Sequence, residues 1–271
     1  QICDTDRTYG LDGNLSHVPS ADSFDKLDKS KYHLREHPIE VRHGFVWSQP
    51  SGSSVKEWLG DFDDDLESAG LRDWVPSTSR THLVAANWKL IMDAFSEGYH
   101  IRTLHKESLS RFFLEATILD QSGSHLRQVG ARRSLRENKE APEMSRDTTL
   151  FYNIFPNTVL VMHPTWLTWL TLWPLSVSET RVEHTCLAPP DFDQASVEKS
   201  FRHIDETVFV SEDFYAAASI QRSVSAGAID EMVVGGREDG RSLHTSGGSP
   251  IKGVRSRGAH SDSGGGLIEV A

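Results

Sequence analysis

The spacing of apolar positions changes several times along the chain, and each change predicts a different kind of element. Short stretches near residues 39–41 and 44–47 alternate apolar and polar side chains, which predicts a small β module in residues 1–50. Apolar residues then recur at helical spacing over residues 55–71. This second pattern predicts a connecting helix within a linker of residues 51–80.

A larger domain is predicted in residues 81–240. Residues 82–109 fit a strand-like entry followed by one amphipathic helix. β-Branched and aromatic side chains dominate residues 151–188, which favours a buried antiparallel sheet. Residues 195–224 return to helical spacing, so we expect a long C-terminal helix after the sheet.

The last segment, residues 241–271, is rich in Ser, Gly, Arg and Lys and has no periodic apolar positions. This composition predicts a disordered tail. The elements before it predict an α+β fold, in which a small β module precedes a curved antiparallel sheet wrapped over a long helix.

Composition excludes several classes of partner. A formal net charge of −11 argues against a broad nucleic-acid surface, because phosphate binding needs clustered Lys and Arg. No apolar run approaches the ~20 residues that a membrane-spanning helix needs, so no membrane is expected as a partner. Two cysteines, Cys3 and Cys186, cannot form a disulfide framework, and no signal peptide precedes them. We therefore expect a cytoplasmic protein.

Two histidines near the end of the amphipathic helix predicted within residues 82–109 are candidate metal ligands. His100 and His105 are five residues apart. On a regular helix that separation places the side chains ~140° apart, so joint ligation requires a helix terminus or a π-type distortion. Gly98 would ease such a distortion. From spacing alone, a solvated helix face or ordinary core contacts are the commoner interpretation.

A carboxylate far along the chain completes a candidate ligand set. Glu212 and Asp213 lie within the predicted C-terminal helix, which could direct one carboxylate toward the histidine pair. Two imidazoles and one carboxylate with open positions suit ferrous iron that binds dioxygen. The alternative is a surface position, because Asp213 is one of 39 acidic residues.

Three separate motifs resemble those of one enzyme family. The segments Asn87-Trp88-Lys89 and Glu97-Gly98-Tyr99-His100, with His105, resemble the Asn-Trp-Lys and Glu-x-Tyr-His-x4-His signature of Rieske non-heme iron oxygenase α subunits. Phe155-Pro156-Asn157 resembles the motif before the family's central strands, and Glu212-Asp213 with Gln221-Arg222 resembles its Glu-Asp-x7-Gln-Arg helix. Because Gly44-Phe45-Val46-Trp47 also resembles the strand that closes the Rieske module, the resemblance covers about residues 8–240.

The resemblance implies a fold and a site. The fold would be a helix-grip (START/Bet v1-like) sheet around a long C-terminal helix, preceded by a partial Rieske module. His100, His105 and Asp213 would bind mononuclear Fe(II). Glu97 would occupy the place of the acid that bridges the iron site to a neighbouring subunit's cluster, although a solvated helix position is its alternative.

The resemblance also implies an activity and partners. We expect Fe(II)- and O2-dependent hydroxylation of an aromatic or related apolar ring, by mono- or dioxygenation. Electrons would come from NAD(P)H through a reductase or ferredoxin, and the chain would form a homotrimer. A non-catalytic small-molecule binder with the same helix-grip cavity, and an inactive fragment, are the alternatives.

The sequence departs from the family at the cluster. A Rieske [2Fe-2S] cluster needs two cysteines and two histidines. Near the N-terminus only Cys3 remains, and Asp6 stands where the first histidine belongs. We therefore expect this chain to bind ferrous iron but to show little NAD(P)H-coupled oxygenation. A diverged paralogue and a truncated or frameshifted product would both account for this difference.

Three further features are candidates for supporting roles. Asp93, one turn before Glu97, could orient a ligand histidine, or could equally lie on the surface. His163 could face a cavity, with a hydrogen bond to the backbone as the commoner alternative. The large rings of Trp166, Trp169 and Trp173 could line a substrate pocket or form plain core.

Overall fold

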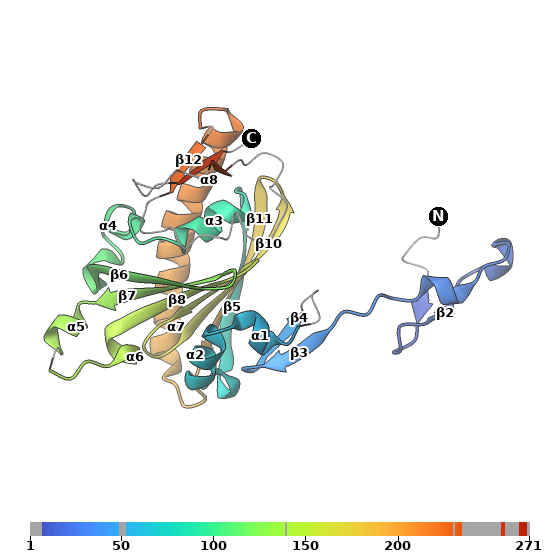
Figure 1. Ribbon diagram of the computed structural model, residues 1–271, viewed down its shortest axis with the longest axis horizontal. Helices are drawn as coiled ribbons and strands as arrows, with labels where there is room; N and C mark the ends of the chain where they lie inside the picture. The colour runs from blue at the N-terminus through green and yellow to red at the C-terminus, as the bar shows by residue number, and fades with distance from the viewer. Residues whose placement is uncertain are drawn as a thin grey trace. The chain divides into compact units, whose positions relative to one another are not determined.

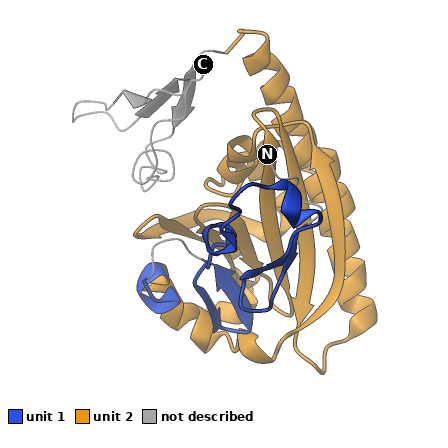
Figure 2. Cartoon of the chain, turned by 90° about the vertical axis from the view of Figure 1, so that its right-hand side faces the viewer, with its two compact units in different colours: residues 1–58 blue, residues 59–271 orange. Residues whose placement is uncertain are grey.

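The computed structural model describes residues 7–48, 53–138 and 140–229. It also describes the backbone of three short strands, β12 (Glu231–Val234), β13 (Ser256–Arg257) and β14 (Gly266–Glu269), which pair in the order β12-β14-β13. The chain divides into two compact units, Gln1–Trp58 and Leu59–Ala271 (Figure 2). The disorder predicted for residues 241–271 falls mostly outside the described residues, as do Cys3 and Asp6.

The first unit contains the strands that the alternating pattern predicted. β3 (Ile39–Arg42) pairs antiparallel with β4 (Phe45–Ser48), and β1 (Thr8–Tyr9) pairs with β2 (Leu15–His17). Trp47 on β4 is buried and packs edge-on against Trp58, with 5.7 Å between the ring centroids. Two 3-10 helices, η2 (Ala21–Ser23) and η3 (Lys29–Tyr32), lie between the two strand pairs.

The connecting helix predicted over residues 55–71 is divided into shorter pieces. Two α-helices, α1 (Val55–Leu59) and α2 (Phe62–Ser68), are followed by the 3-10 helix η4 (Leu71–Asp73). Gly60 separates the two α-helices with a φ of 58°. Glycine adopts this left-handed conformation without steric cost, so the helix ends there. The prediction of a single helix was wrong for this reason.

A seven-stranded antiparallel sheet dominates the second unit, in the order β5-β11-β10-β9-β8-β7-β6 (Figure 1). The buried sheet predicted for residues 151–188 is confirmed, because the four strands β8 to β11 lie there. No strand was predicted for β6 or β7. The residues of β6 are mostly exposed or half-buried and show little apolar alternation, and the buried residues of β7 include the polar side chains of His125 and Gln128. The strands are β5 (Val75–Val84), β6 (Phe113–Ser122), β7 (His125–Arg132), β8 (Thr148–Ile154), β9 (Thr158–Met162), β10 (Leu167–Ser176) and β11 (Glu179–Ala188).

A long C-terminal helix packs along this sheet, as the spacing over residues 195–224 predicted (Figure 1). It consists of α7 (Gln194–Arg202), the π-helical segment η6 (His203–Phe214) and α8 (Tyr215–Ser225). Asp193 caps α7, since its side chain accepts a hydrogen bond from the backbone N–H of Ser196. The helix contributes apolar side chains to the main core, which removes apolar surface from water and stabilises the contact with the sheet. Its buried residues in that core are Val208, Phe209, Phe214 and Ala217, and Val197 and Phe201 are buried in a second apolar cluster.

The amphipathic helix predicted within residues 82–109 is interrupted. α3 (Trp88–Ala94) ends, and α4 (His100–Thr103) begins only at the first histidine of the candidate pair. Ser96 closes the end of α3, because its hydroxyl donates to the carbonyl oxygen of Met92. Four shorter helical segments complete the second unit: η5 (Ser110–Phe112), α5 (Ser134–Glu137) and α6 (Met144–Asp147), with η4 before β5.

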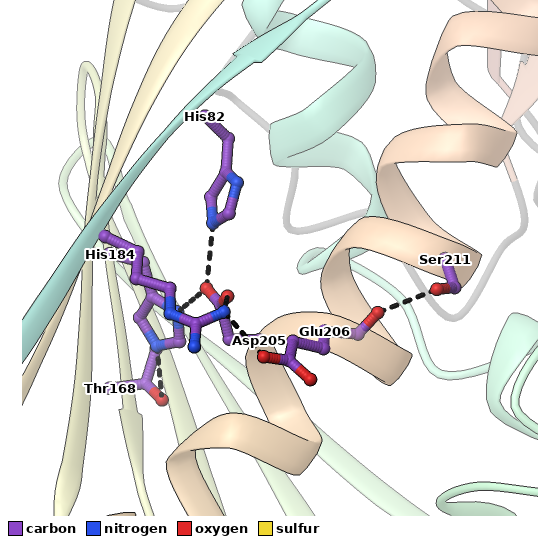
Figure 3. A network of polar contacts seen from close by, with 7 residues as sticks. His82, Thr168, His184, Asp205, Glu206 and Ser211 are labelled. Carbon is purple, nitrogen blue, oxygen red and sulfur yellow. Dashed lines mark hydrogen bonds and ion pairs between the residues drawn. The ribbon is translucent and has the colours of Figure 1, made fainter.

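One buried carboxylate joins the long helix to the sheet (Figure 3). Asp205 Oδ1 lies 2.8 Å from His82 Nε2 and 2.7 Å from His184 Nδ1, and Oδ2 accepts a hydrogen bond from Arg80 at 3.1 Å. Burial acts to raise the pKa of Asp205, but the hydrogen bonds from His184 and His82 outweigh burial and lower it. Asp205 precedes Asp213 on the same helix, so these contacts hold the segment that carries the predicted iron ligand.

Two further observations concern the described residues alone. None of the described helices combines the length and the apolar character that a membrane crossing needs. Cys186 is a free thiol on β11 with no exposed surface, and burial raises its pKa to about 12.

Candidate metal centre and adjoining pocket

His100, His105 and Asp213 lie together, although more than one hundred residues separate the histidines from the aspartate. One possible ligand atom from each residue lies within 4.8 Å of the other two. Asp213 Oδ1 is 3.0 Å from His105 Nε2 and 3.8 Å from His100 Nε2. His105 and Asp213 are buried and His100 is half-buried, so the three side chains meet below the surface.

A short helix lets the two histidines face the same point. His100 is the first residue of α4, and His105 follows the end of that four-residue helix. The backbone N–H of His105 donates to the carbonyl oxygen of His100 at 3.4 Å. This hydrogen bond spans five residues, whereas the hydrogen bonds of a regular α-helix span four. The imidazole rings are therefore 4.9 Å apart, between centroids. The two histidines therefore lie at a helix terminus, which is one of the two arrangements that joint ligation by this pair requires.

The third side chain comes from the π-helical part of the long helix. Asp213 is the second-last residue of η6 and is 6% exposed. π-Helical turns inside α-helices occur frequently at functional sites. The pattern of apolar residues predicted a helix here but did not distinguish its π-helical middle from a regular α-helix.

Each histidine has its second ring nitrogen bound to a carboxylate. Glu97 contacts Nδ1 of His100, and Glu212 Oε2 lies 2.7 Å from Nδ1 of His105. A carboxylate accepts hydrogen bonds, so both Nδ1 atoms donate, and in the neutral imidazole, the form that binds a metal, the Nε2 atom keeps a lone pair. Ser108 donates to the same Glu212 oxygen at 2.6 Å. Both lone pairs are then available to one ion.

The carboxylates also shift the pKa values of this site. Burial acts to lower the pKa of His105, but the nearby Asp213 and Glu212 outweigh burial and raise it. Burial acts to raise the pKa of Glu97, but contact with His100 and with backbone N–H groups outweighs burial and lowers it. Glu97 is therefore held as an anion beside His100.

Glu97 and Glu212 are the acids that contact the Nδ1 atoms. The sequence had suggested Asp93 for such a role, and Glu212 was recognised only as the neighbour of Asp213 in a motif. Glu212 lies next to a candidate ligand on the same helix, and that adjacency was the one signal available in the sequence.

The environment of one oxygen atom, Asp213 Oδ1, is that expected of a metal ligand. Asp213 Oδ1 is buried and has no hydrogen-bond partner among the described residues, because its approach to His105 Nε2 lacks hydrogen-bond geometry. A buried carboxylate oxygen without a partner is costly, and a cation removes that cost. Two imidazole nitrogens and one carboxylate oxygen could hold a divalent ion such as ferrous iron.

A pocket of about 350 Å³ adjoins the three side chains. Glu97, His100, His105 and Asp213 line it, so the candidate ligands face an open space. Its walls are largely apolar and aromatic, as small-molecule sites usually are. The apolar lining includes Phe95, Phe113, Phe151, Val161, Trp166 and Phe209.

Of the three tryptophans proposed for a pocket wall, Trp166 lines this pocket, while Trp169 and Trp173 are absent from its lining. His163 also lines it and stacks on Trp166, with the ring centroids 4.0 Å apart. Its Nε2 lies 3.2 Å from the hydroxyl of Thr168. Burial lowers the pKa of His163 to about 3, so the imidazole is neutral at ordinary pH.

The chain is similar to known oxygenase subunits. Residues 71–245 match the family described as ring hydroxylating alpha subunit (catalytic domain). The carnitine monooxygenase oxygenase subunit of Escherichia coli (strain K12) is 24% identical over 249 residues, which are 90% of this chain and 64% of that protein. The corresponding subunit of Acinetobacter pittii (strain PHEA-2) is 23% identical over 81% of this chain and 61% of its own length. The chain thus spans less than two thirds of these curated relatives.

Solved structures show the same fold. The quaternary ammonium Rieske monooxygenase CntA in complex with L-carnitine has a TM-score of 0.63 at 20% identity, over 82% of this chain and 60% of CntA. Naphthalene 1,2-dioxygenase from Rhodococcus sp. bound to indole has a TM-score of 0.60 at 19% identity, over 79% of this chain and 61% of that enzyme. The α+β fold with a large antiparallel sheet is that of Rieske oxygenase catalytic domains. The match over most of the second unit establishes that the chain belongs to the family of Rieske-type ring-hydroxylating oxygenase α subunits.

Proposed function

We propose that this chain carries the iron-dependent catalytic centre of an oxygenase, with Fe(II) held by His100, His105 and Asp213. The observation that carries the proposal is the convergence of two imidazole nitrogens and one carboxylate oxygen beside an apolar pocket. When bound there, ferrous iron supplies the activation of dioxygen. Glu97 and Glu212 orient the two imidazoles through their Nδ1 atoms.

The pocket supports an apolar substrate. Its aromatic walls favour a ring or a related apolar body, which they would hold beside the three ligands while excluding water. The relatives' names cover both carnitine and naphthalene, so family membership leaves mono- and dioxygenation open. The volume of the pocket, about 350 Å³, and its apolar walls limit the substrate to a small and largely apolar molecule.

The remaining family properties belong to the proposal as well. In intact family members electrons would come from NAD(P)H through a reductase or ferredoxin, and Glu97 stands where the family places the acid that bridges to a neighbouring subunit's [2Fe-2S] cluster. Because this chain lacks the cluster ligands, we expect a homotrimer of it to show little NAD(P)H-coupled oxygenation. The sheet and long helix would form the helix-grip arrangement, and the strands before residue 50 would be the partial Rieske module. We further propose that residues 51–80 form a linker and that residues 81–240 form the catalytic domain. The proposed location is the cytoplasm.

Iron stoichiometry tests the proposed function. We expect the purified chain, loaded with Fe(II) under anaerobic conditions and desalted, to retain one iron per chain. The visible spectrum of the same sample should lack the absorption of a [2Fe-2S] cluster, because only Cys3 remains of the cluster motif, Asp6 replaces its first histidine, and the other cysteine, Cys186, is buried on β11. A folded chain, judged by a cooperative thermal transition, that retains no iron would refute the proposal. A non-catalytic binder would instead keep its ligand affinity in His100→Ala.

Replacement of Glu212 tests how His105 is oriented. We expect Glu212→Ala to weaken Fe(II) binding by about 10- to 100-fold, the range typical of losing a hydrogen-bond partner of a metal-bound histidine. Glu212→Gln should lose less, because an amide oxygen still accepts from His105 Nδ1. Anaerobic titration with a competing chelator measures the affinity. Equal iron affinity in wild type and Glu212→Ala would show that the contact between Glu212 and His105 has no orienting role.

A further inference from the structure

Arg132, at the end of β7, places a cation in the wall of the same pocket. Its guanidinium donates to the Thr149 hydroxyl at 3.1 Å and lies 5.8 Å from the centre of the Phe113 ring. Thr149 and Phe113 also line the pocket. Among the described residues, Arg132 forms no ion pair with a carboxylate.

Other half-buried arginines of the sheet are neutralised. Arg127, on the same strand, contacts Asp65 and Asp120, and Arg80 contacts Asp205. Glu206 and Asp205 raise the pKa of Arg80, and Asp65 and Asp120 raise that of Arg127, whereas burial lowers the pKa of Arg132. A half-buried charge that lacks a counterion is costly to the fold. The guanidinium of Arg132 is therefore a candidate binding group for an anion.

The charge lies away from the acids of the pocket. Gln128 approaches the loop before the histidines, since a Cβ on Gly98 would lie 3.0 Å from Gln128 Nε2. Arg132 is four residues further along the same face of β7, which is roughly 13 Å in an extended strand. Glu97 and Asp213 are the acids among the lining residues, and both belong to the candidate metal centre. The pocket thus has an acidic, metal-binding end and a basic end.

Apolar side chains separate the two ends. Gly130 lies between Gln128 and Arg132, and a Cβ there would come within 3.4 Å of the rings of Phe113 and Phe151. The missing side chain lets these two rings close the pocket wall beside β7. A ligand that fills the pocket would therefore place an apolar body against these rings, with a polar group at Arg132.

We propose that Arg132 binds the carboxylate of an organic monoanion whose apolar body points toward the candidate iron ligands. The orientation of the body rests on the proposed function, whereas the carboxylate site depends on Arg132 alone. A guanidinium offers paired N–H donors that match a carboxylate. The Thr149 hydroxyl, which accepts from Arg132, keeps its own proton as a further donor.

A single negative charge fits better than two. One guanidinium faces the pocket, two acids line its opposite end, and the chain carries a net charge of −11. This field repels a phosphate dianion more strongly than a carboxylate. The pocket volume of about 350 Å³ suits a small molecule with one ring or a short chain.

Matched pairs of ligands test the site. The probes are phenylacetate, 3-phenylpropanoate and 4-phenylbutanoate, each with its own amide, titrated calorimetrically into the whole chain at low salt. We expect at least one carboxylate to bind about ten-fold more tightly than its amide, as a charge-assisted hydrogen bond implies. The preference should disappear in Arg132→Gln and persist in part in Arg132→Lys. It should be unchanged in Arg136→Gln, which alters an exposed arginine outside the pocket lining.

The outcomes separate this inference from the iron site. No preference for any carboxylate, or a preference that persists in Arg132→Gln, overturns the carboxylate site. Iron stoichiometry is measured on the same samples, so iron without carboxylate preference refutes the inference and leaves the proposed function intact. A carboxylate preference in a chain that retains no iron supports the carboxylate site and refutes the proposed function. Should Arg132→Gln fail to fold, Arg132→Lys decides: its preference for carboxylates over amides must be smaller than that of the wild type, and an unchanged preference overturns the site.

Discussion

Asp213→Ala is expected to abolish stoichiometric binding of Fe(II) by this chain. The substitution removes the one carboxylate among the three converging side chains and leaves two imidazoles. The loss of affinity should exceed the roughly 10- to 100-fold decrease that follows removal of an outer hydrogen-bond partner. Iron per chain after anaerobic loading and desalting measures the effect.

A thermal shift provides a second measurement of the same change. A ligand present at 100 times its Kd stabilises the native state by about 2.7 kcal/mol, so Fe(II) should raise the Tm of the wild type. Asp213→Ala should show no such increase. Glu198→Gln is the matched control, because it removes a carboxylate from the same helix outside the site. If Asp213→Ala bound iron as the wild type does, the carboxylate would not be a ligand.

Asp205→Ala is expected to lower the free energy of unfolding by about 3–5 kcal/mol, the cost of breaking a buried charged network. The substitution leaves His184, which has no exposed surface, without the acceptor for its Nδ1 proton. It also removes the partner of His82 and one partner of Arg80. Unpaired buried donors are costly, so most of the loss comes from the two histidines. Urea unfolding of the metal-free chain measures it.

Glu206→Gln is the control for that experiment. Glu206 is the next residue on the helix and contacts the same Arg80 at 2.8 Å, but its side chain is 52% exposed. Solvent screens this contact, so the loss should stay below about 1 kcal/mol. Similar destabilisation by both substitutions would contradict the view that burial makes Asp205 the anchor of the helix.

Strong local patterns account for the elements that were predicted correctly. The strands in residues 151–188 are buried and rich in β-branched and aromatic side chains, so composition identified them. The long helix buries apolar residues at helical spacing from Val197 to Ala217. β6 was missed because its residues are largely exposed or half-buried, and a strand without a buried face has no apolar alternation. β7 was missed because its buried residues include the polar residues His125 and Gln128. The break between α3 and α4 was missed because apolar spacing continues across it.

Some residues of the candidate site were predicted from the sequence, and others were found only in the structure. Motif spacing named His100, His105 and Asp213, and the fold brings their atoms within 4.8 Å; their role as ligands stays a prediction. Glu97 was predicted as an electron bridge, and its contact with His100 is compatible with that role without testing it. The orienting contact of Glu212 and the unpaired charge of Arg132 followed from no motif.

The sequence by itself determined the family, the order of sheet and helix, and the side chains that are candidates for iron, because these depend on local periodicity and on residues at short spacing. Only the tertiary structure decided that Glu212 contacts His105 and that Arg132 has no carboxylate partner among the described residues. Pairing between distant charges depends on which strands and helices pack together. A single sequence, read through local spacing, does not specify those long-range contacts.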